Sequence, residues 1–174
     1  MSGIHPTRLI SSCGAKVNVT SCGSVLEISC RGNPDPALAN IVHALGMAVS
    51  PEPGYAAGDD PQLLWVAPNR WWLIDELRRT TGISLPRIAV TEIGDAVMRL
   101  QIHGESAREW LSNSCPVDLR AKSFGSGRLA WTLLCESRVL LHCKNDGEFD
   151  LYVDRSLCQH IVDRCSEHSG DGDA

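Results

Sequence analysis

The chain has 174 residues, of which 43% are hydrophobic, with 16 Lys and Arg against 21 Asp and Glu. This length suits one domain with a real core or two very small lobes. The net charge of −5 and the lack of any basic stretch longer than Arg78-Arg79 argue against a nucleic-acid surface. No run approaches the ~20 apolar residues needed to span a bilayer, so we expect no membrane segment.

Eight cysteines raise the question of disulfide bonds. Residues 1–12 are mostly polar, contain Pro6 and lack the basic-then-apolar pattern of a secretion signal. Without export, reduced and buried thiols are the ordinary state of cysteine. We therefore predict a cytoplasmic protein with free structural cysteines, while the even count leaves a disulfide framework open.

The first quarter of the chain predicts an arm, a strand and a helix. Residues 1–24 are rich in Ser, Gly, Thr and Cys, which predicts an extended or mobile arm before a single domain of residues 25–167. Residues 25–30 alternate apolar and polar side chains, as in a strand. Asp35-Pro36 predicts the start of a helix that Gly46 ends, and residues 50–61 are typical of a loop.

A tryptophan-rich hairpin follows. Residues 63–67 and 71–74 are two apolar runs separated by the turn residues Pro68-Asn69-Arg70. Because side chains alternate along a strand, Trp71 and Trp72 should point to opposite faces. We expect one ring in the core and the other covered by a loop of this chain or by a partner. A short helix over residues 75–81 is expected next.

In residues 90–119 the apolar period changes from two to 3.6. Residues 98–102 alternate as a strand, after a turn at Gly94-Asp95. A helix follows, because Ala107, Trp110, Leu111 and Ser114 share one helical face. Ser106 with Glu109 suggests a capping box, and Pro116 should end this helix.

The last third predicts a three-stranded meander and a helix. Residues 129–135 are apolar on both faces, which indicates a strand covered on both sides. Turns are expected at Glu136-Ser137 and at Asp146-Gly147, with strands over residues 139–143 and 149–153. Ser156 with Gln159 suggests the capping box of the final helix, before a frayed acidic tail of residues 168–174. The buried stripe of this helix should be Leu157, Ile161, Val162 and Cys165.

These elements predict an α+β fold. The order strand, helix, hairpin occurs over residues 25–74 and again over residues 97–143, a weak sign of internal duplication. The strands are too closely spaced for repeated βαβ crossovers. We therefore predict a mostly antiparallel sheet with helices on one face.

Familiar catalytic motifs are missing from the sequence. It contains no G-x-G-x-x-G after a strand, no phosphate-binding loop, no H-E-x-x-H and no G-x-S-x-G. Cys158, His160, Cys165 and His168 are the nearest approach to a zinc set, but Cys158 and Cys165 would lie about 10 Å apart along a helix. Cys135 and Cys143 could face each other across a hairpin.

A thiol enzyme that uses Cys115 or Cys135 with His103 remains open, because such partners meet in space rather than in sequence. Cys115 lies at a helix C-terminus, where the helix dipole does not lower the pKa of a thiol.

The hairpin Leu-Trp-Val-Ala-Pro-Asn-Arg-Trp-Trp-Leu over residues 64–73 resembles the "leucine-tryptophan-x-x-proline-x-x-tryptophan" hairpin of the gamma subunit of heterotetrameric sarcosine oxidase. Further similar positions are Gly104, Ala107, Arg108, Leu111, residues 115–119, Phe124, Gly127, residues 132–134, residues 139–141 and residues 149–156. The resemblance covers residues 62–167, about three-fifths of the chain.

The resemblance implies a fold similar to the folate-binding domains of aminomethyltransferases. It also implies membership of a four-subunit flavoenzyme that oxidatively demethylates sarcosine or a related N-methyl amino acid. In such complexes the large subunits carry FAD, FMN, NAD and tetrahydrofolate, the smallest carries zinc, and the gamma chain binds no cofactor or metal. Its partners would be the alpha, beta and delta subunits, and N-methylglutamate dehydrogenase complexes have a similar subunit.

We interpret the chain as a non-catalytic structural subunit, with no catalytic, cofactor-binding or metal site. Its expected partner interface comprises Trp65, Arg70, Trp71, Trp72 and Trp110. The alternative is a free-standing folate-binding accessory protein of the aminomethyltransferase type, for which Asp118 and Trp131 are the candidate ligand contacts.

Overall fold

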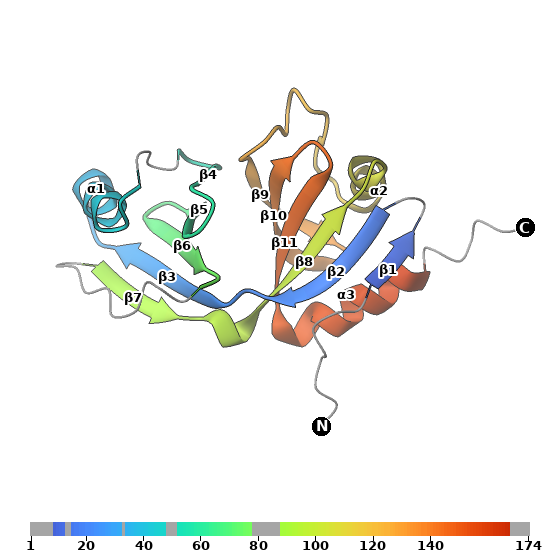
Figure 1. Ribbon diagram of the computed structural model, residues 1–174, viewed down its shortest axis with the longest axis horizontal. Coiled ribbons are helices and arrows are strands. Elements are labelled where there is room, and N and C mark those ends of the chain that lie inside the picture. The colour runs from blue at the N-terminus through green and yellow to red at the C-terminus, as the bar shows by residue number, and fades with distance from the viewer. Residues whose placement is uncertain (1–8, 13–14, 33, 48–51, 78–87, 168–174) are drawn as a thin grey trace, which may run out of the picture. The chain divides into compact units, whose positions relative to one another are not determined.

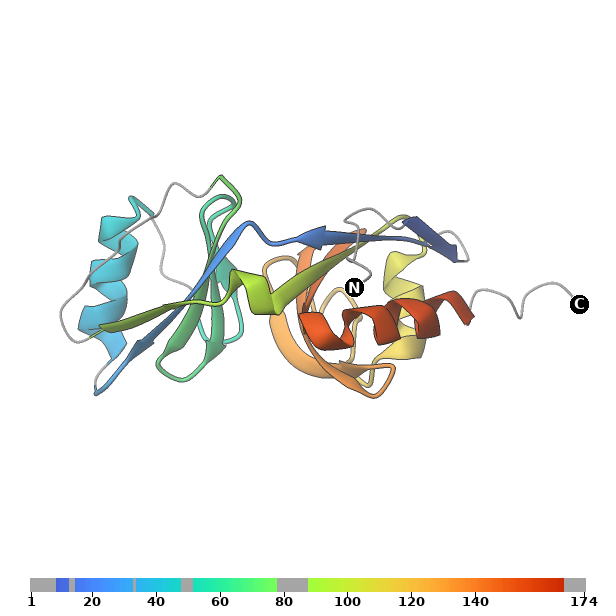
Figure 2. The same cartoon turned by 90° about the horizontal axis from the view of Figure 1, so that it is seen from below.

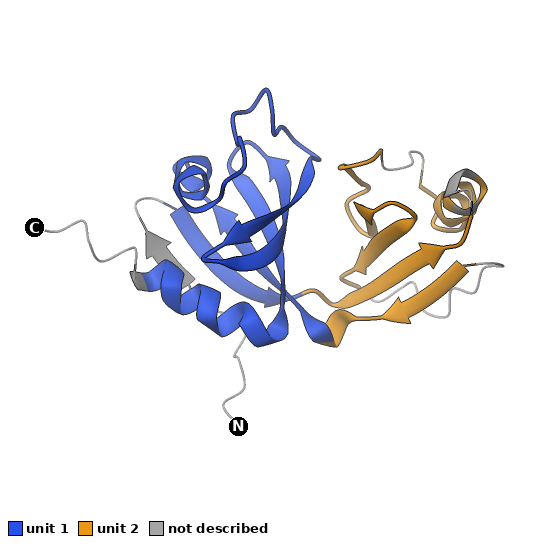
Figure 3. Cartoon of the chain, turned by 180° about the vertical axis from the view of Figure 1, so that it is seen from behind, with its two compact units in different colours: residues 1–21, 96–174 blue, residues 22–95 orange. Residues whose placement is uncertain are grey.

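The computed structural model describes residues 9–12, 15–32, 34–47, 52–77 and 88–167. These residues form two compact units, one of residues 1–21 with 96–174 and one of residues 22–95 (Figure 3). The chain thus divides where a single domain of residues 25–167 was expected. No helix within the described ranges is long and apolar enough to cross a membrane.

The first unit contains a six-stranded antiparallel sheet. Its strands are β1 (Leu9–Ser12), β2 (Ala15–Ser21), β8 (Val97–His103), β9 (Leu129–Leu134), β10 (Ser137–Asn145) and β11 (Glu148–Asp154). They lie in the order β1-β2-β8-β11-β10-β9, which can be followed in Figure 1. Two helices, α2 (Ala107–Ser114) and α3 (Arg155–Glu167), complete the unit.

Both helices of this unit contribute to the core on one face of the sheet. Leu100, Leu141 and Leu151 come from three neighbouring strands and cluster with Leu111 of α2 and Ile161 of α3. All five side chains are fully buried. The alternating apolar residues of these strands therefore form the buried face of the sheet, as predicted. The α+β fold with an antiparallel sheet is confirmed.

Residues 15–21 are an interior strand of this sheet, not part of an arm. Strand β2 pairs with β8 from Lys16 opposite His103 to Ser21 opposite Met98. Ala15, Val17 and Val19 are buried in the core, but they alternate with Lys16, Asn18 and Thr20 in a Ser- and Thr-rich stretch, which makes the apolar period hard to recognise. This burial of every second side chain is what fixes the strand in place.

The second unit is a five-stranded antiparallel sheet with one helix. Its strands are β3 (Ser24–Cys30), β4 (Ala56–Ala57), β5 (Gln62–Ala67), β6 (Arg70–Asp75) and β7 (Ile88–Glu92), in the order β4-β5-β6-β3-β7. Helix α1 (Pro34–Ala44) lies alongside the sheet (Figure 2) and buries Ile41 against Leu26, Ile28 and Leu73.

Gly46 ends α1 as predicted. Its φ of 63° is left-handed, its N–H donates to the carbonyl of His43, and the N–H of Met47 donates to that of Val42. This pair of bonds is the Schellman arrangement, for which glycine is the usual residue.

The two sheets repeat one topology. In the second unit β3 leads through α1 into the meander β4-β5-β6, and β6 returns beside β3. In the first unit β8 leads through α2 into the meander β9-β10-β11, and β11 returns beside β8. The predicted repetition of element order is thus matched by a repetition of strand order.

In each sheet one strand pairs with a strand far from it in sequence. Strand β2 is followed in sequence by β3 of the second unit but pairs with β8 of the first. Strand β7 is followed in sequence by β8 of the first unit but pairs with β3 of the second. The short 3₁₀ helix η1 (Gly94–Ala96) joins β7 to β8 at the predicted turn.

The turn between β9 and β10 lies one residue earlier than predicted. Leu134 pairs with Ser137, so the central residues are Cys135 and Glu136, with φ of 48° and 63°. Two positive φ values are the mark of a type I′ turn, whose usual residues are Asn and Gly, and neither is present to reveal it.

The ends and faces of two helices also differ from the prediction. The amide and hydroxyl of Ser156 both donate to Asp154 Oδ1, at 2.8 and 2.6 Å, so Asp154 is the N-cap of α3. Cys158 is buried in place of Leu157, which is 38% exposed.

Helix α2 begins after Ser106, which makes no side-chain capping bond. Cys115 ends that helix in an extended conformation before Pro116, as predicted.

The remaining differences concern β9 and β6. Strand β9 is an edge strand on which Trp131 and Leu133 are exposed, not a strand covered on both faces. Asp75 ends β6 and a turn follows at residues 76–77, where a helix over residues 75–81 was expected. The rest of that segment and the tail of residues 168–174 lie outside the described residues.

Candidate functional site

The tryptophan hairpin forms as predicted, around a turn with Pro68 followed by Asn69 at a φ of 59°. Trp65 and Trp71 are directly opposite each other and belong to the cluster that packs on α1. Trp71 is 1% exposed and Trp65 is half-buried. Trp71 therefore supports the core, and only Trp65 of this pair keeps an accessible surface.

Trp72 points to the opposite face of the hairpin, as the strand alternation requires. Its indole N–H donates to Glu27 Oε2 at 3.1 Å, and Arg70 Nε lies 3.7 Å from Glu27 Oε1. Trp72 is 9% exposed, whereas the Arg70 side chain is 54% exposed. Of the predicted interface residues in this hairpin, Arg70 offers the most surface to another molecule.

Trp110, the fifth predicted interface residue, lies on the buried face of α2 and is 9% exposed. It borders a cavity of about 160 Å³. The other lining residues are Asn113, Ser114, Cys135, Arg164 and Cys165.

Three thiols meet near this cavity. The thiols of Cys135 and Cys165 are hydrogen-bonded to each other, and this bond together with burial raises the pKa of Cys165 far above its ordinary value. Burial, with a smaller contribution from Cys135, raises the pKa of Cys115 to about 12. Both Cys115 and Cys165 are therefore protonated at neutral pH, whereas a nucleophilic cysteine needs a lowered pKa.

His103 does not meet these thiols in the described geometry. It lines a separate polar cavity of about 350 Å³ beside strand β8. The other lining residues are Asn18, Gln101, Ile102, Lys144, Glu148, Phe149 and Asp150. The thiol and imidazole groups of the thiol-enzyme interpretation thus lie in two different pockets.

The polar face of the first sheet was not anticipated from the sequence. The strand register places Asn18, Gln101, Asp150 and His142 in one row across four strands. Asp150 and His142 are each 2% exposed, and Asp150 Oδ2 lies 4.0 Å from Arg99 Nη1 and accepts a 3.5 Å hydrogen bond from the Tyr152 hydroxyl. The only sequence signal was a polar residue at alternate positions of each strand, and their meeting depends on the strand order.

His142 is neutral at physiological pH. Burial, and to a smaller extent the nearby Lys144 charge, lowers the pKa of His142 from 6.5 to about 4. Its Nδ1 has no hydrogen-bond partner within the described part of the chain. Burial away from water disfavours the charged imidazolium, so this side chain resists protonation.

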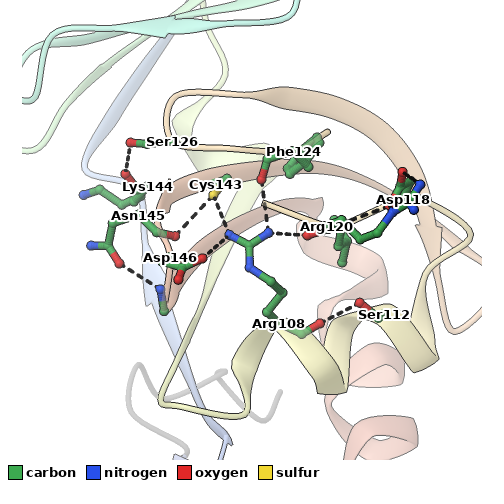
Figure 4. A network of polar contacts seen from close by, with 12 residues as sticks. Arg108, Ser112, Asp118, Arg120, Phe124, Ser126, Cys143, Lys144, Asn145 and Asp146 are labelled. Atoms are coloured by element: carbon green, nitrogen blue, oxygen red, sulfur yellow. Dashed lines mark hydrogen bonds and ion pairs between the residues drawn. The ribbon is translucent and has the colours of Figure 1, made fainter. Parts of the chain in front are cut away.

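Arg108 is the centre of a network of polar contacts (Figure 4). From α2 its Nη1 donates to the carbonyls of Leu119 and Phe124, the latter at 3.1 Å. Its Nη2 lies 2.9 Å from Asp146 Oδ1 and 3.7 Å from Cys143 Sγ, and the guanidinium sits 5.0 Å from the Phe149 ring centroid. One side chain therefore joins α2, the loop of residues 118–127 and the β10–β11 hairpin.

The two candidate folate contacts have different neighbours. Hydrogen bonds from Arg120 and Ser123 hold the pKa of Asp118 well below its usual range, with Arg120 Nη2 2.6 Å from Asp118 Oδ2. Trp131 stacks instead under the Arg138 guanidinium, 4.2 Å from the ring centroid. Neither Asp118 nor Trp131 lines the cavities of about 160 and 350 Å³ described above.

Metal-binding groups do not converge among the described residues: no set of three His, Cys, Asp or Glu has the geometry for an ion. The seven cysteines within the described ranges form no disulfide bond, and His168 of the zinc set considered from the sequence lies outside those ranges. A cavity of about 700 Å³ lies where β3 meets β7 and is lined by Ser29, Cys30, Arg31, Ile88 and Ala89.

Comparison with known proteins decides the family. The sequence pattern of the sarcosine oxidase, gamma subunit family matches residues 31–169. The chain belongs to the sarcosine oxidase gamma subunit family. The match covers most of the chain and confirms the resemblance carried by the tryptophan hairpin and the stretches after it.

Solved structures agree with this family at the level of the fold. A chain of the heterotetrameric sarcosine oxidase from Corynebacterium sp. U-96, in complex with pyrrole 2-carboxylate, aligns with a TM-score of 0.76 and 22% identity. The alignment covers 97% of this chain and 91% of that one. A search of curated proteins found no match.

Proposed function

We propose that this gamma-family chain is a structural subunit of a multi-subunit enzyme that oxidatively demethylates sarcosine or a related N-methyl amino acid. The observation that carries the proposal is the family match over residues 31–169. Its partners would be alpha, beta and delta subunits of the same oxidase or dehydrogenase. FAD, FMN, NAD, tetrahydrofolate and zinc would reside in those partners.

The chemistry of the polar groups supports a structural role for the chain. The guanidinium of Arg108 is engaged with backbone carbonyls and Asp146, and the pKa of Cys115 is raised rather than lowered. Asp118, the carboxylate of the folate alternative, is held by Arg120. These side chains stabilise loops and helix ends, which suits a subunit that shapes a complex.

The test is to purify the affinity-tagged full-length chain from its native host and to identify the co-purifying proteins by mass spectrometry. We expect flavoprotein subunits that oxidise sarcosine or another N-methyl amino acid, with activity retained by the complex and not by the separated chain. Oxidation of sarcosine by the chain alone, stoichiometric flavin binding by it, or the absence of any flavoprotein partner would overturn the proposal.

A further inference from the structure

Strand β9 is a sheet edge without the usual protection. Within the described residues it pairs with β10 alone, from Leu134 opposite Ser137 to Leu129 opposite His142, without a register shift. Its sequence, Leu-Ala-Trp-Thr-Leu-Leu, contains no charged residue and no proline. Proteins ordinarily protect exposed edges with charge, proline, a bulge or very short strands.

The other three edges of the two sheets formed by the described residues differ from β9 in this respect. Strand β7 carries Glu92, β4 has two residues, and β1 has four. Strand β9 has six residues, and Trp131 and Leu133 are 37% and 49% exposed on it. It is therefore the edge of this chain that is best suited to accept another strand.

The backbone of β9 supports strand addition. In a two-residue hairpin the residues that flank the turn, here Leu134 and Ser137, form a hydrogen-bonded pair, and the pattern then alternates along the strand. The N–H and C=O of Leu133 consequently point away from β10. An added strand would find these groups in line with the exposed Leu133 and Trp131 side chains.

A cationic side chain, Arg138, lies beside this edge. Arg138 of β10 lies directly opposite Leu133 and stacks 4.2 Å from the centroid of the Trp131 ring. A ring face satisfies none of the guanidinium N–H donors, and none of the described acidic side chains forms an ion pair with Arg138. Charge complementarity therefore calls for a carboxylate on the molecule that covers this surface.

We propose that the β9 edge, with Trp131, Leu133 and Arg138, is where an extended segment of a partner subunit adds to the six-stranded sheet. That segment would pair with β9 through its backbone, place apolar side chains on Trp131 and Leu133, and present a carboxylate to Arg138. The inference rests on the proposed function, because it assigns a contact surface within that complex.

The test uses the full complex, with the tagged chain co-expressed with the subunits identified by co-purification. Leu133→Lys places a charge on the edge, and Leu157→Lys is the matched control on α3, where Leu157 is 38% exposed. We expect Leu133→Lys and Arg138→Glu each to weaken subunit binding at least about tenfold, and Leu157→Lys to leave it unchanged. Thermal melting of each isolated variant verifies that it folds.

A second measurement does not depend on any variant. Hydrogen–deuterium exchange of the unmodified chain should show the Leu133 amide exchanging freely alone and protected in the complex. This inference would be overturned if Leu133→Lys bound the other subunits as tightly as the unmodified chain and the Leu133 amide stayed unprotected in the complex. The proposed function would still stand. Failure of the unmodified chain to bind any subunit would overturn both, and a dimer of the chain alone that Leu133→Lys dissociates would assign the edge to a second copy instead.

Discussion

Arg108 is the residue whose loss should cost the first unit most among its charged side chains. Arg108→Ala removes the donor shared by the Leu119 and Phe124 carbonyls and the ion pair with Asp146. We expect the free energy of unfolding to fall by about 2–3 kcal/mol, because buried acceptors are left without a donor. Urea denaturation measures this change.

Arg120→Ala is the matched control for Arg108→Ala. The Arg120 side chain is 69% exposed and bonds to Asp118 two residues away, so its removal should change stability far less. Equal losses from the two variants would contradict the assignment of Arg108 as the organising residue of this network.

His142 should make the fold sensitive to mild acid. Its folded pKa of about 4 lies below the ordinary 6.5, so between these values the unfolded chain binds a proton that the folded chain excludes. Stability from this group is complete above pH 6.5 and falls by up to about 3 kcal/mol as pH drops to 4. Urea denaturation at several pH values should therefore show a smaller acid loss for His142→Gln than for the unmodified chain.

His160→Gln serves as the control for the acid effect. His160 is exposed on α3, so His160→Gln replaces a histidine outside the core and reports the effect of the substitution itself. An acid loss in His142→Gln as large as that of the unmodified chain would show that carboxylates, rather than this imidazole, account for the effect.

At the level of secondary structure, two residues at the start of α3, Asp154 and Ser156, are candidates for its N-cap. Asp154→Ala removes the acceptor for the Ser156 amide at the N-terminus of the helix, and we expect a loss of about 1 kcal/mol. Ser156→Ala removes only a hydroxyl that donates to the same carboxylate, so its effect should be smaller. Thermal unfolding of the two variants measures the difference, and a larger loss from Ser156→Ala would restore the capping box predicted from the sequence.

Periodicity was sufficient to predict most elements but not their ends. The strands that include Leu26, Leu100 and Leu151 and the helix with Trp110 and Leu111 were predicted because one face of each is buried. The turn at Cys135 was misplaced because its left-handed residues are not the usual ones. The exposed face of β9 was missed because composition cannot tell an edge strand from an interior one.

The candidate contact surfaces show the same limit at the scale of the whole molecule. Five residues were selected because tryptophan and arginine are common at interfaces, yet Trp71 and Trp110 are core residues. Trp131, which is 37% exposed at a sheet edge, was considered only for folate. Whether an aromatic side chain is buried depends on the order of the strands in each sheet. That order includes two pairings between strands distant in sequence, β2 with β8 and β7 with β3.

Because β2 pairs with β8, we expect it to be required for the stability of the first unit, although its Ser- and Thr-rich sequence does not indicate this. Val19 is 2% exposed and lies opposite Leu100, in the middle of the first sheet. Val19→Asp would bury an unpaired carboxylate there, and we expect a loss of at least about 3 kcal/mol or failure to fold. Lys16→Asp, on the exposed side of the same strand, should be tolerated.

Soluble yield and urea denaturation of the full-length variants distinguish an interior strand from an extended arm. An arm would tolerate Val19→Asp as well as Lys16→Asp, because neither side chain would enter a core. A strand between β1 and β8 would tolerate only Lys16→Asp. Val19→Asp would place a charge in the core and disrupt the packing of Val17, Leu100 and Ile102. Loss of the first sheet from a single substitution at residue 19 would show that residues 15–21, which precede the second unit in sequence, are required to fold the first.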